Sequence, residues 1–306
     1  MVDLQRIARL RELFLDDDRG AHALGDYWRD RDDLAAYDAF LGARIGWKWD
    51  AALAECRDRG FARADGDVVV DFGCGAGIAA RRFVAHFGAR EVLCHDRSPL
   101  ATAFAVERLA ATAPGVPARA LAAIDGVAPD VLLVSHVLGE LDARGEQTLH
   151  ELLLRSRRAV LVEPGNRPVA RRLSALRDRL LAEFHVIAPC PHRERCPALA
   201  DDGDWCHFFA PPPPHVFTDG DWVRTARAVG IDLRALTYAF VALDRAPADG
   251  FGPPNRVLGR ADVTAHAASL RLCTVDGIQT TTLTKRNDRA AWRALKKSPA
   301  SHRAWP

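Results

Sequence analysis

The chain has 306 residues, of which 48% are hydrophobic and 27% charged, and its formal net charge is +2 at pH 7. This length suits one large domain with appendages, and no stretch approaches the roughly 18 consecutive apolar residues that a membrane span needs. The N-terminal residues lack the apolar core and cleavage site of a signal peptide. We therefore expect a soluble, cytoplasmic protein with no membrane partner.

Residues 1–64 are predicted to form an N-terminal helical region. Apolar side chains recur at spacings of three and four along 32–56, which is the pattern of an amphipathic helix. Gly60 and the Asp65-Gly66 pair then supply turn signals. We expect these helices to pack as a cap on the domain that follows.

The stretch Val68–Gly77, VVVDFGCGAG, carries the clearest local signal in the chain. β-Branched residues run into Asp71, as in a buried parallel strand, and Gly73, Gly75 and Gly77 follow where a helix is predicted to begin. Glycines at such a point let the backbone turn tightly and approach a ligand closely. The pattern indicates a nucleotide-type site on a doubly wound sheet.

An acidic residue follows the second predicted strand, Glu91–His95. Asp96 lies nineteen residues beyond Gly77, where a carboxylate can accept hydrogen bonds from both hydroxyls of a ribose. The alternation continues with helices predicted over 78–87, 99–113 and 145–157 and strands over 118–121, 130–136 and 159–163. This order predicts a right-handed parallel sheet.

The glycine spacing G-x-G-x-G differs from the dinucleotide fingerprint G-x-G-x-x-G. Preceded by an acidic residue, it resembles motif I of the Rossmann-like class I methyltransferases, which use S-adenosylmethionine. The resemblance implies an α/β fold with residues 65–246 as the methyltransferase domain. It also implies a cofactor site made of Asp71, Gly73, Gly75, Gly77 and Asp96.

The fourth predicted strand, 130–136, leads into the segment SHVLGEL. In the methyltransferases this strand end lines the site of methyl transfer, so the resemblance makes His136 and Glu140 candidates for a general base. The segment has neither the Asn-Pro-Pro-Tyr loop of amino-directed base methyltransferases nor the Pro-Cys nucleophile of C5-pyrimidine enzymes. The acceptor atom is therefore undefined.

Three of the seven cysteines gather in an irregular insertion predicted over 186–215. Its residues 188–215 read APCPHRERCPALADDGDWCHFFAPPPPH. Prolines next to Cys190 and Cys196, and the run after Cys206, exclude a regular helix or strand there. In a cytoplasmic chain, such a cluster more often binds a metal than forms a disulfide.

The fourth ligand of this metal site is open. Cys273 could supply it from a predicted C-terminal strand, and His192 or His207 could complete a zinc site, because zinc accepts sulfur and nitrogen ligands. Four thiolates would suit an iron–sulfur cluster equally well. Spacing alone does not choose between the two metals.

The C-terminal part begins with a helix predicted over 218–230 and two strands over 231–236 and 238–244, which the resemblance makes the antiparallel pair of the methyltransferase sheet. A linker rich in proline and glycine follows. Residues 247–284, which include it, are predicted to form a small β extension with a hairpin turn at Asp276-Gly277.

Residues 285–306 are predicted to be a basic tail. The tail holds seven basic residues against one acidic residue, whereas only four of the 42 basic residues of the whole chain are lysines. A concentrated basic segment suits contact with phosphates, so we expect the tail to contact RNA. A merely solvated tail is the alternative.

The combination of DFGCGAG, SHVLGEL, APCPHRERCP with WCHF, and the late LCTVDG resembles the methyltransferase-like assembly factors of the mitochondrial ribosomal small subunit and their bacterial relatives. The resemblance covers residues 35–285. It implies binding to small-subunit ribosomal RNA or a pre-ribosomal particle. It further implies a [4Fe–4S] cluster held by Cys190, Cys196, Cys206 and Cys273.

Three functions are compatible with these features. The first is an S-adenosylmethionine-dependent methyltransferase that acts on small-subunit ribosomal RNA. The second is a non-catalytic assembly factor that uses the same fold, cofactor pocket and cluster to bind RNA. The third is a small-molecule methyltransferase with a structural zinc, which the basic tail and the resemblance disfavour.

Overall fold

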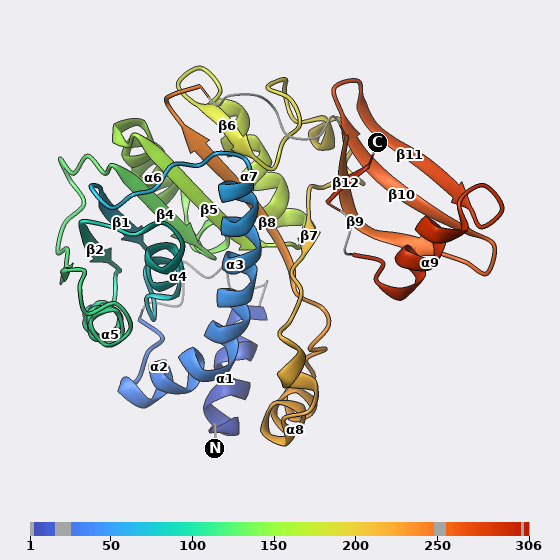
Figure 1. Ribbon diagram of the computed structural model, residues 1–306. Helices are drawn as coiled ribbons and strands as arrows, with labels where there is room; N and C mark the ends of the chain where they lie inside the picture. The colour runs from blue at the N-terminus through green and yellow to red at the C-terminus, as the bar shows by residue number, and fades with distance from the viewer. Residues whose placement is uncertain (1–2, 16–25, 248–254, 301–302, 306) are drawn as a thin grey trace. The chain divides into compact units, whose positions relative to one another are not determined.

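The computed structural model describes residues 3–15, 26–247, 255–300 and 303–305 (Figure 1). The chain divides into two compact units. The first unit comprises Met1–Ala54, Ala62–Val162 and Pro212–Leu236, and the second comprises Glu55–Phe61, Glu163–Pro211 and Thr237–Pro306. Within the described ranges, no helix is both long enough and apolar enough to cross a membrane. The predicted proline- and glycine-rich linker, beyond residue 247, lies outside the described residues.

Five parallel strands form the sheet of the first unit, in the order β3-β2-β1-β4-β5. Their bounds are β1 Val68–Phe72, β2 Glu91–His95, β3 Ala118–Ala120, β4 Val131–Ser135 and β5 Arg158–Pro164, the last two residues of which belong to the second unit. Val69 of β1 pairs with Val92 on one side and Val131 on the other, and all three side chains are fully buried. The sequence of buried β-branched runs thus predicts this sheet correctly, and its strand order is that of a doubly wound, Rossmann-like fold.

Helices surround this sheet and extend from it (Figure 1). Local signals explain several of their ends: the Ser98 hydroxyl accepts a hydrogen bond from Ala101 N, and Pro99 takes the first helical position. A π-helical segment, Asp38–Gly42, joins two of the helices without a break. The helices of this unit are α1 Leu4–Leu15, α2 Arg31–Tyr37, α3 Ala43–Asp58, α4 Ile78–Phe87, α5 Pro99–Thr112, α6 Ala143–Arg155 and α8 Gly220–Ala228, with the end of α3 in the second unit.

The second unit contains helix α7 (Arg167–Arg179) and two sets of antiparallel strands. Strand β8 (Thr237–Asp244) pairs with β6 (His185–Ala188) and with β7 (Phe208–Phe209). The other strands form a four-stranded sheet in the order β11-β10-β9-β12, namely β9 Asn255–Val263, β10 Ala267–Thr274, β11 Gly277–Thr284 and β12 Ala304–Trp305.

Helix α9 (Arg289–Lys297) packs on this four-stranded sheet (Figure 1). Its Trp292 and Leu295 are buried with Leu270 of β10, whereas its basic side chains are exposed. The predicted hairpin is confirmed, because Thr274 pairs with Gly277 across a two-residue turn. Because α9 lies within residues 285–306, the predicted basic tail contains a helix.

The strand predicted over 231–236 is wrong. The Ile231 amide donates to Ala226 O (2.8 Å) and closes the end of α8. Asp232 then accepts hydrogen bonds from Arg234 N through its carboxylate (2.8 Å) and from Ala235 N through its carbonyl (3.1 Å). These local bonds favour a turn over an extended strand. In the second unit, β8 pairs antiparallel with β6 and β7 instead.

Candidate cofactor site and cysteine cavity

The three glycines after β1 differ in what surrounds them. All have positive φ, at +69° for Gly73, +48° for Gly75 and +72° for Gly77. A Cβ on Gly73 would lie 2.5 Å from Val137 Cγ2, and one on Gly77 would lie 3.0 Å from Ala105 Cβ. A Cβ on Gly75 would meet no atom within 4 Å. Two glycines therefore allow close packing, and Gly75 faces open space that a ligand can occupy.

Asp96 lies directly beside this loop, at the end of β2. Its Oδ2 accepts a hydrogen bond from Gly75 N and its Oδ1 accepts one from Ser98 N, both at 2.9 Å. Burial raises the pKa of Asp96 above its usual value. Each carboxylate oxygen keeps a lone pair beyond these bonds, so an oriented carboxylate stands ready to accept hydroxyl donors.

Asp71 lies beneath the loop and is fully buried. Its Oδ2 accepts a hydrogen bond from Ala80 N (3.2 Å) in the first turns of α4, and its Oδ1 has no hydrogen-bond partner among the described residues. Burial raises the pKa of Asp71 to about 7, and the charge of Asp96 adds to this effect. This buried carboxylate oxygen can therefore accept a hydrogen bond from a bound ligand.

Glu140 brings a third carboxyl group to the same region. Burial raises its pKa to about 7, with Arg97 opposing and Asp96 adding to the rise. The Arg97 guanidinium stands 3.7 Å from the Glu140 carboxylate and 5.3 Å above the ring of Tyr27. Three carboxyl groups with raised pKa values lie in this region, and Arg97 acts on only two of them, Asp96 and Glu140, so the site suits a ligand that carries positive charge.

His136, the first residue after β4, has a strained backbone. Its φ of 58° is the only positive value at a non-glycine residue in the described chain. Its Nε2 lies 3.3 Å from Lys48 Nζ, and its buried Nδ1 has no hydrogen-bond partner among the described residues. Burial and the Lys48 charge hold the pKa of His136 well below its usual value, so the imidazole is neutral.

Helix α3 adds residues that the sequence did not single out for this site. Trp49 Nε1 donates a hydrogen bond to Ser135 Oγ (2.9 Å), and the preceding residue, Lys48, reaches His136. Lys48 is one of only four lysines in the chain, which was the one available hint. Arg97 and Tyr27 could be linked to Glu140 only in three dimensions.

The four cysteines predicted as ligands come together in the second unit. Cys190, Cys196, Cys206 and Cys273 line one cavity of about 20 Å³. Burial raises the pKa of Cys273 to about 12, and the charges that Cys190 and Cys196 would carry raise it further. No carboxylate lines this cavity among the described residues, so in kind the donors fit a thiophilic metal.

The four cysteines line one cavity, but their sulfur atoms are not arranged as the ligands of a metal site. All seven cysteines are free thiols, and within the described ranges no three His, Cys, Asp or Glu side chains form a group that could hold a metal ion. Cys273 Sγ instead lies 3.6 Å from His192 Nε2. His207 is not among the residues that line the cavity, and its ring stacks on Trp205.

Two side chains of helix α7 bind backbone atoms of the loop that carries Cys190 and Cys196. Arg177 donates hydrogen bonds to the carbonyls of Glu194 (2.5 Å) and His192 (3.1 Å). The neighbouring Asp178 accepts a hydrogen bond from Cys196 N at 2.9 Å. These charge-assisted bonds fix the backbone between Cys190 and Cys196.

A protein-family model decides the relationship of the chain. The model of the mitochondrial small ribosomal subunit protein Rsm22 matches residues 54–303, which include the glycine loop, Asp96 and all four cysteines of the cavity. The chain belongs to the Rsm22 family. The family resemblance of the sequence is thereby confirmed. No curated protein sequence matches the chain.

Several solved structures resemble this Rsm22-family chain at low identity. Magnesium protoporphyrin IX methyltransferase from Synechocystis PCC 6803, solved with bound SAH, is 14% identical over 80% of this chain and 100% of its own, with a TM-score of 0.42. PH1948 from Pyrococcus horikoshii, a candidate RNA methyltransferase, is 12% identical over 75% of this chain and 98% of its own, with a TM-score of 0.39.

Proposed function

We propose that this protein binds S-adenosylmethionine at the ends of β1 and β2 and acts in the cytoplasm on small-subunit ribosomal RNA, as a methyltransferase within ribosome assembly. The observation that carries the proposal is the pairing of Gly75, which faces open space, with Asp96, which is oriented beside it. Family membership supports the ribosomal partner.

The residues of the loop would divide the binding of the cofactor between them. Asp96 would accept the ribose hydroxyls, since its carboxylate is already fixed by two backbone amides. The loop at Gly75 would let the ligand approach the backbone, and the carboxyl groups of Asp71 and Glu140 would favour its cationic end. The bound group would supply an electrophilic methyl on a sulfonium.

The chain's own chemistry at β4 would concern the proton of the acceptor. His136 is held neutral and its Nε2 faces the Lys48 ammonium, which can only donate, so the unpaired Nδ1 carries the ring proton and could donate a hydrogen bond to the acceptor. Glu140, with a pKa of about 7, is poised between its acid and base forms near neutral pH. Direct transfer would otherwise depend on positioning and on exclusion of water.

The exposed face of α9 supports RNA as the partner. Arg289, Arg293, Lys296 and Lys297 of α9 are exposed, as is Lys285 just before the helix. Trp292 of α9 is buried and has Lys285 and Lys296 over its ring at 4.9 and 5.0 Å. A rigid helix that presents several cations on one face suits a phosphate backbone. This face would contact RNA during assembly.

We also propose that Cys190, Cys196, Cys206 and Cys273 hold a [4Fe–4S] cluster, with zinc as the alternative. The four thiols line one cavity without a carboxylate among the described residues, and cluster binding would draw their sulfur atoms closer together than they now lie. Iron and acid-labile sulfide, measured on protein purified without oxygen, test this. Cys190→Ser should lower both, Cys94→Ser in β2 should not, and zinc without sulfide would refute the cluster.

The function is tested by S-adenosylmethionine binding in calorimetry and by transfer of labelled methyl groups to isolated small ribosomal subunits. Asp96→Asn should abolish binding, whereas Asp58→Asn, at an exposed position in α3, should not. Binding and transfer that both depend on Asp96 support an RNA methyltransferase. Binding to subunits without transfer would leave the non-catalytic assembly factor, and unchanged cofactor affinity in Asp96→Asn would refute the site.

A further inference from the structure

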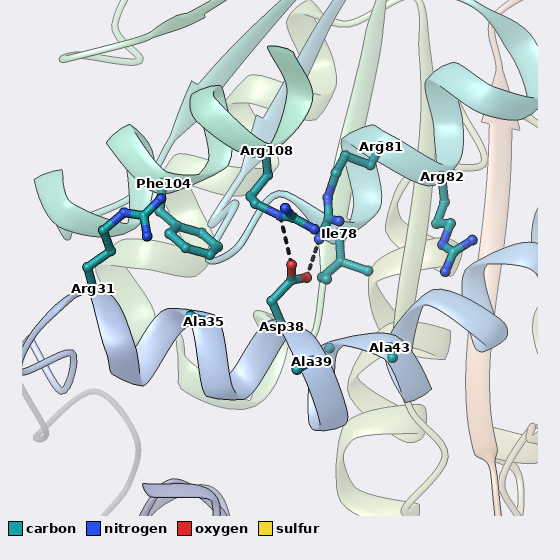
Figure 2. Close-up of a pocket in the computed structure, with 11 residues that line it drawn as sticks. Arg31, Ala35, Asp38, Ala39, Ala43, Ile78, Arg81, Arg82, Phe104 and Arg108 are labelled. Atoms are coloured by element: carbon teal, nitrogen blue, oxygen red, sulfur yellow. Dashed lines mark hydrogen bonds and ion pairs between the residues drawn. The ribbon is translucent and has the colours of Figure 1, made fainter. Parts of the chain in front are cut away.

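A cavity of the first unit lies beside the start of α4, which directly follows the glycine loop. It has a volume of about 360 Å³ and opens between the α2–π-helix segment and the helices α4 and α5. Figure 2 shows Arg31 and Arg82 at its two ends, with Arg81, Arg108 and Asp38 between them. Of the lining residues that the structure describes, four are arginines and one is acidic.

The cavity is hollow because one wall consists of small residues. Ala35, Ala39, Gly42 and Ala43 line it from the N-terminal helices. A Cβ on Gly42 would lie 2.8 Å from Cδ1 of Ile78, so only a glycine allows the wall to pack this closely against α4. This wall includes the π-helical turn, a distortion that often occurs at functional sites.

The arginines are only partly neutralised. The Asp38 carboxylate bridges Arg108, whose Nε lies 2.9 Å away, and Arg81, with which it forms an ion pair. Arg31 and Arg82 form ion pairs with carboxylates that do not line the cavity, Glu107 and Asp50.

Donors remain in this pocket after these contacts. Arg108 is bonded through Nε, and its two terminal nitrogens have no hydrogen-bond partner among the described residues. Arg81 also donates to the carbonyls of Gly77 (3.2 Å) and Ala76 (3.4 Å). Burial lowers its pKa, Asp38 opposes this, and the charges of Arg108 and Arg82 lower it further. Three guanidinium groups thus repel one another across a space that an anion could fill.

We propose that this pocket binds a backbone phosphate of RNA. Guanidinium groups match phosphate oxygens with paired, charge-assisted hydrogen bonds, which ammonium groups cannot do. The proposal deepens the proposed function and rests on it for the identity of the ligand as RNA. The chemistry of the pocket itself requires only a phosphate group.

The layout of the pocket favours a continuous backbone over a free nucleotide. Arg31 and Arg82 are exposed by 56% and 40% of their side chains and mark the two ends, whereas Arg81 between them is exposed by 15%. The aromatic ring in the lining, Phe104, is buried and has the Arg31 guanidinium over it at 5.4 Å. The described lining therefore offers cations for a phosphate and no open ring on which a base could stack.

The test measures binding of fluorescein-labelled oligo(U) by anisotropy over a range of salt concentrations. Arg108→Gln removes a pocket cation, and Ala39→Leu fills the cavity without a change of charge. Each should weaken binding about tenfold, and Arg108→Gln should reduce the slope of log K against log salt by about 0.7. The matched control is Arg63→Gln, which removes an exposed arginine paired with one aspartate outside the pocket and should change neither quantity.

A second measurement distinguishes the source of the phosphate. Inorganic phosphate is added to the wild type and to Arg108→Gln, and the melting temperature is followed. If wild-type protein binds oligo(U) and both pocket variants bind it equally well, the pocket proposal is overturned while the proposed function stands. If phosphate stabilises the wild type alone and oligo(U) does not bind, the pocket is a small-anion site, and the assignment to RNA is overturned.

Discussion

Substitution of Gly75 separates a structural glycine from a ligand-contacting one. Gly75 has a φ of +48° and open space where a Cβ would stand. Gly75→Ala should therefore lower the free energy of unfolding by only about 1 kcal/mol, the cost of a left-handed alanine. A ligand that fills the space would meet the new methyl group, and overpacking by one methyl costs about 1–3 kcal/mol. We expect S-adenosylmethionine to bind roughly 5- to 150-fold more weakly.

Gly126→Ala is the matched control for this prediction. Gly126 also has a positive φ, +70°, and a Cβ added there would meet no atom within 4 Å, but it lies in the loop before β4. It should lose the same stability in urea unfolding and keep its affinity in calorimetry. Equal affinities of the Gly75 and Gly126 variants would refute the assignment of the open space to the cofactor.

Three further outcomes are expected. Asp71 and Glu140 have pKa values of about 7, so both gain negative charge as the pH rises. The affinity for S-adenosylmethionine, measured by calorimetry, should therefore rise from about pH 5 to about pH 8. Over the same range the ligand-free protein should lose stability, because its folded state holds protons that the unfolded state releases. Trp292→Ala, which empties a buried position under α9, should cost about 3–5 kcal/mol in urea unfolding. Trp49→Phe leaves the Ser135 hydroxyl without its indole donor and should cost about 1–2 kcal/mol in the same assay.

Local signals in the sequence predict the backbone of the first unit well. The β-branched run before Asp71 and the Ser98-Pro99 start of α5 depend on neighbours in the chain, so their chemistry can be read directly. The strand predicted over 231–236 is wrong because a second local signal was not weighed against its apolar residues. Its apolar residues suit a strand, but the Asp232 side chain offers the backbone a turn that competes with it.

The spacing of residues along the sequence does not predict which distant side chains come together in the fold. Cys273 comes to the cavity on β10, far in sequence from Cys190. Spacing left it one of three candidates for the fourth ligand, and the resemblance to a family selected it. The arginine pocket had no such guide. Arg81 and Arg108 are separated from Asp38 by 43 and 70 positions, and arginines are so frequent in this chain that none stands out. A pocket of this kind becomes visible only when the helices place its charges around one empty volume.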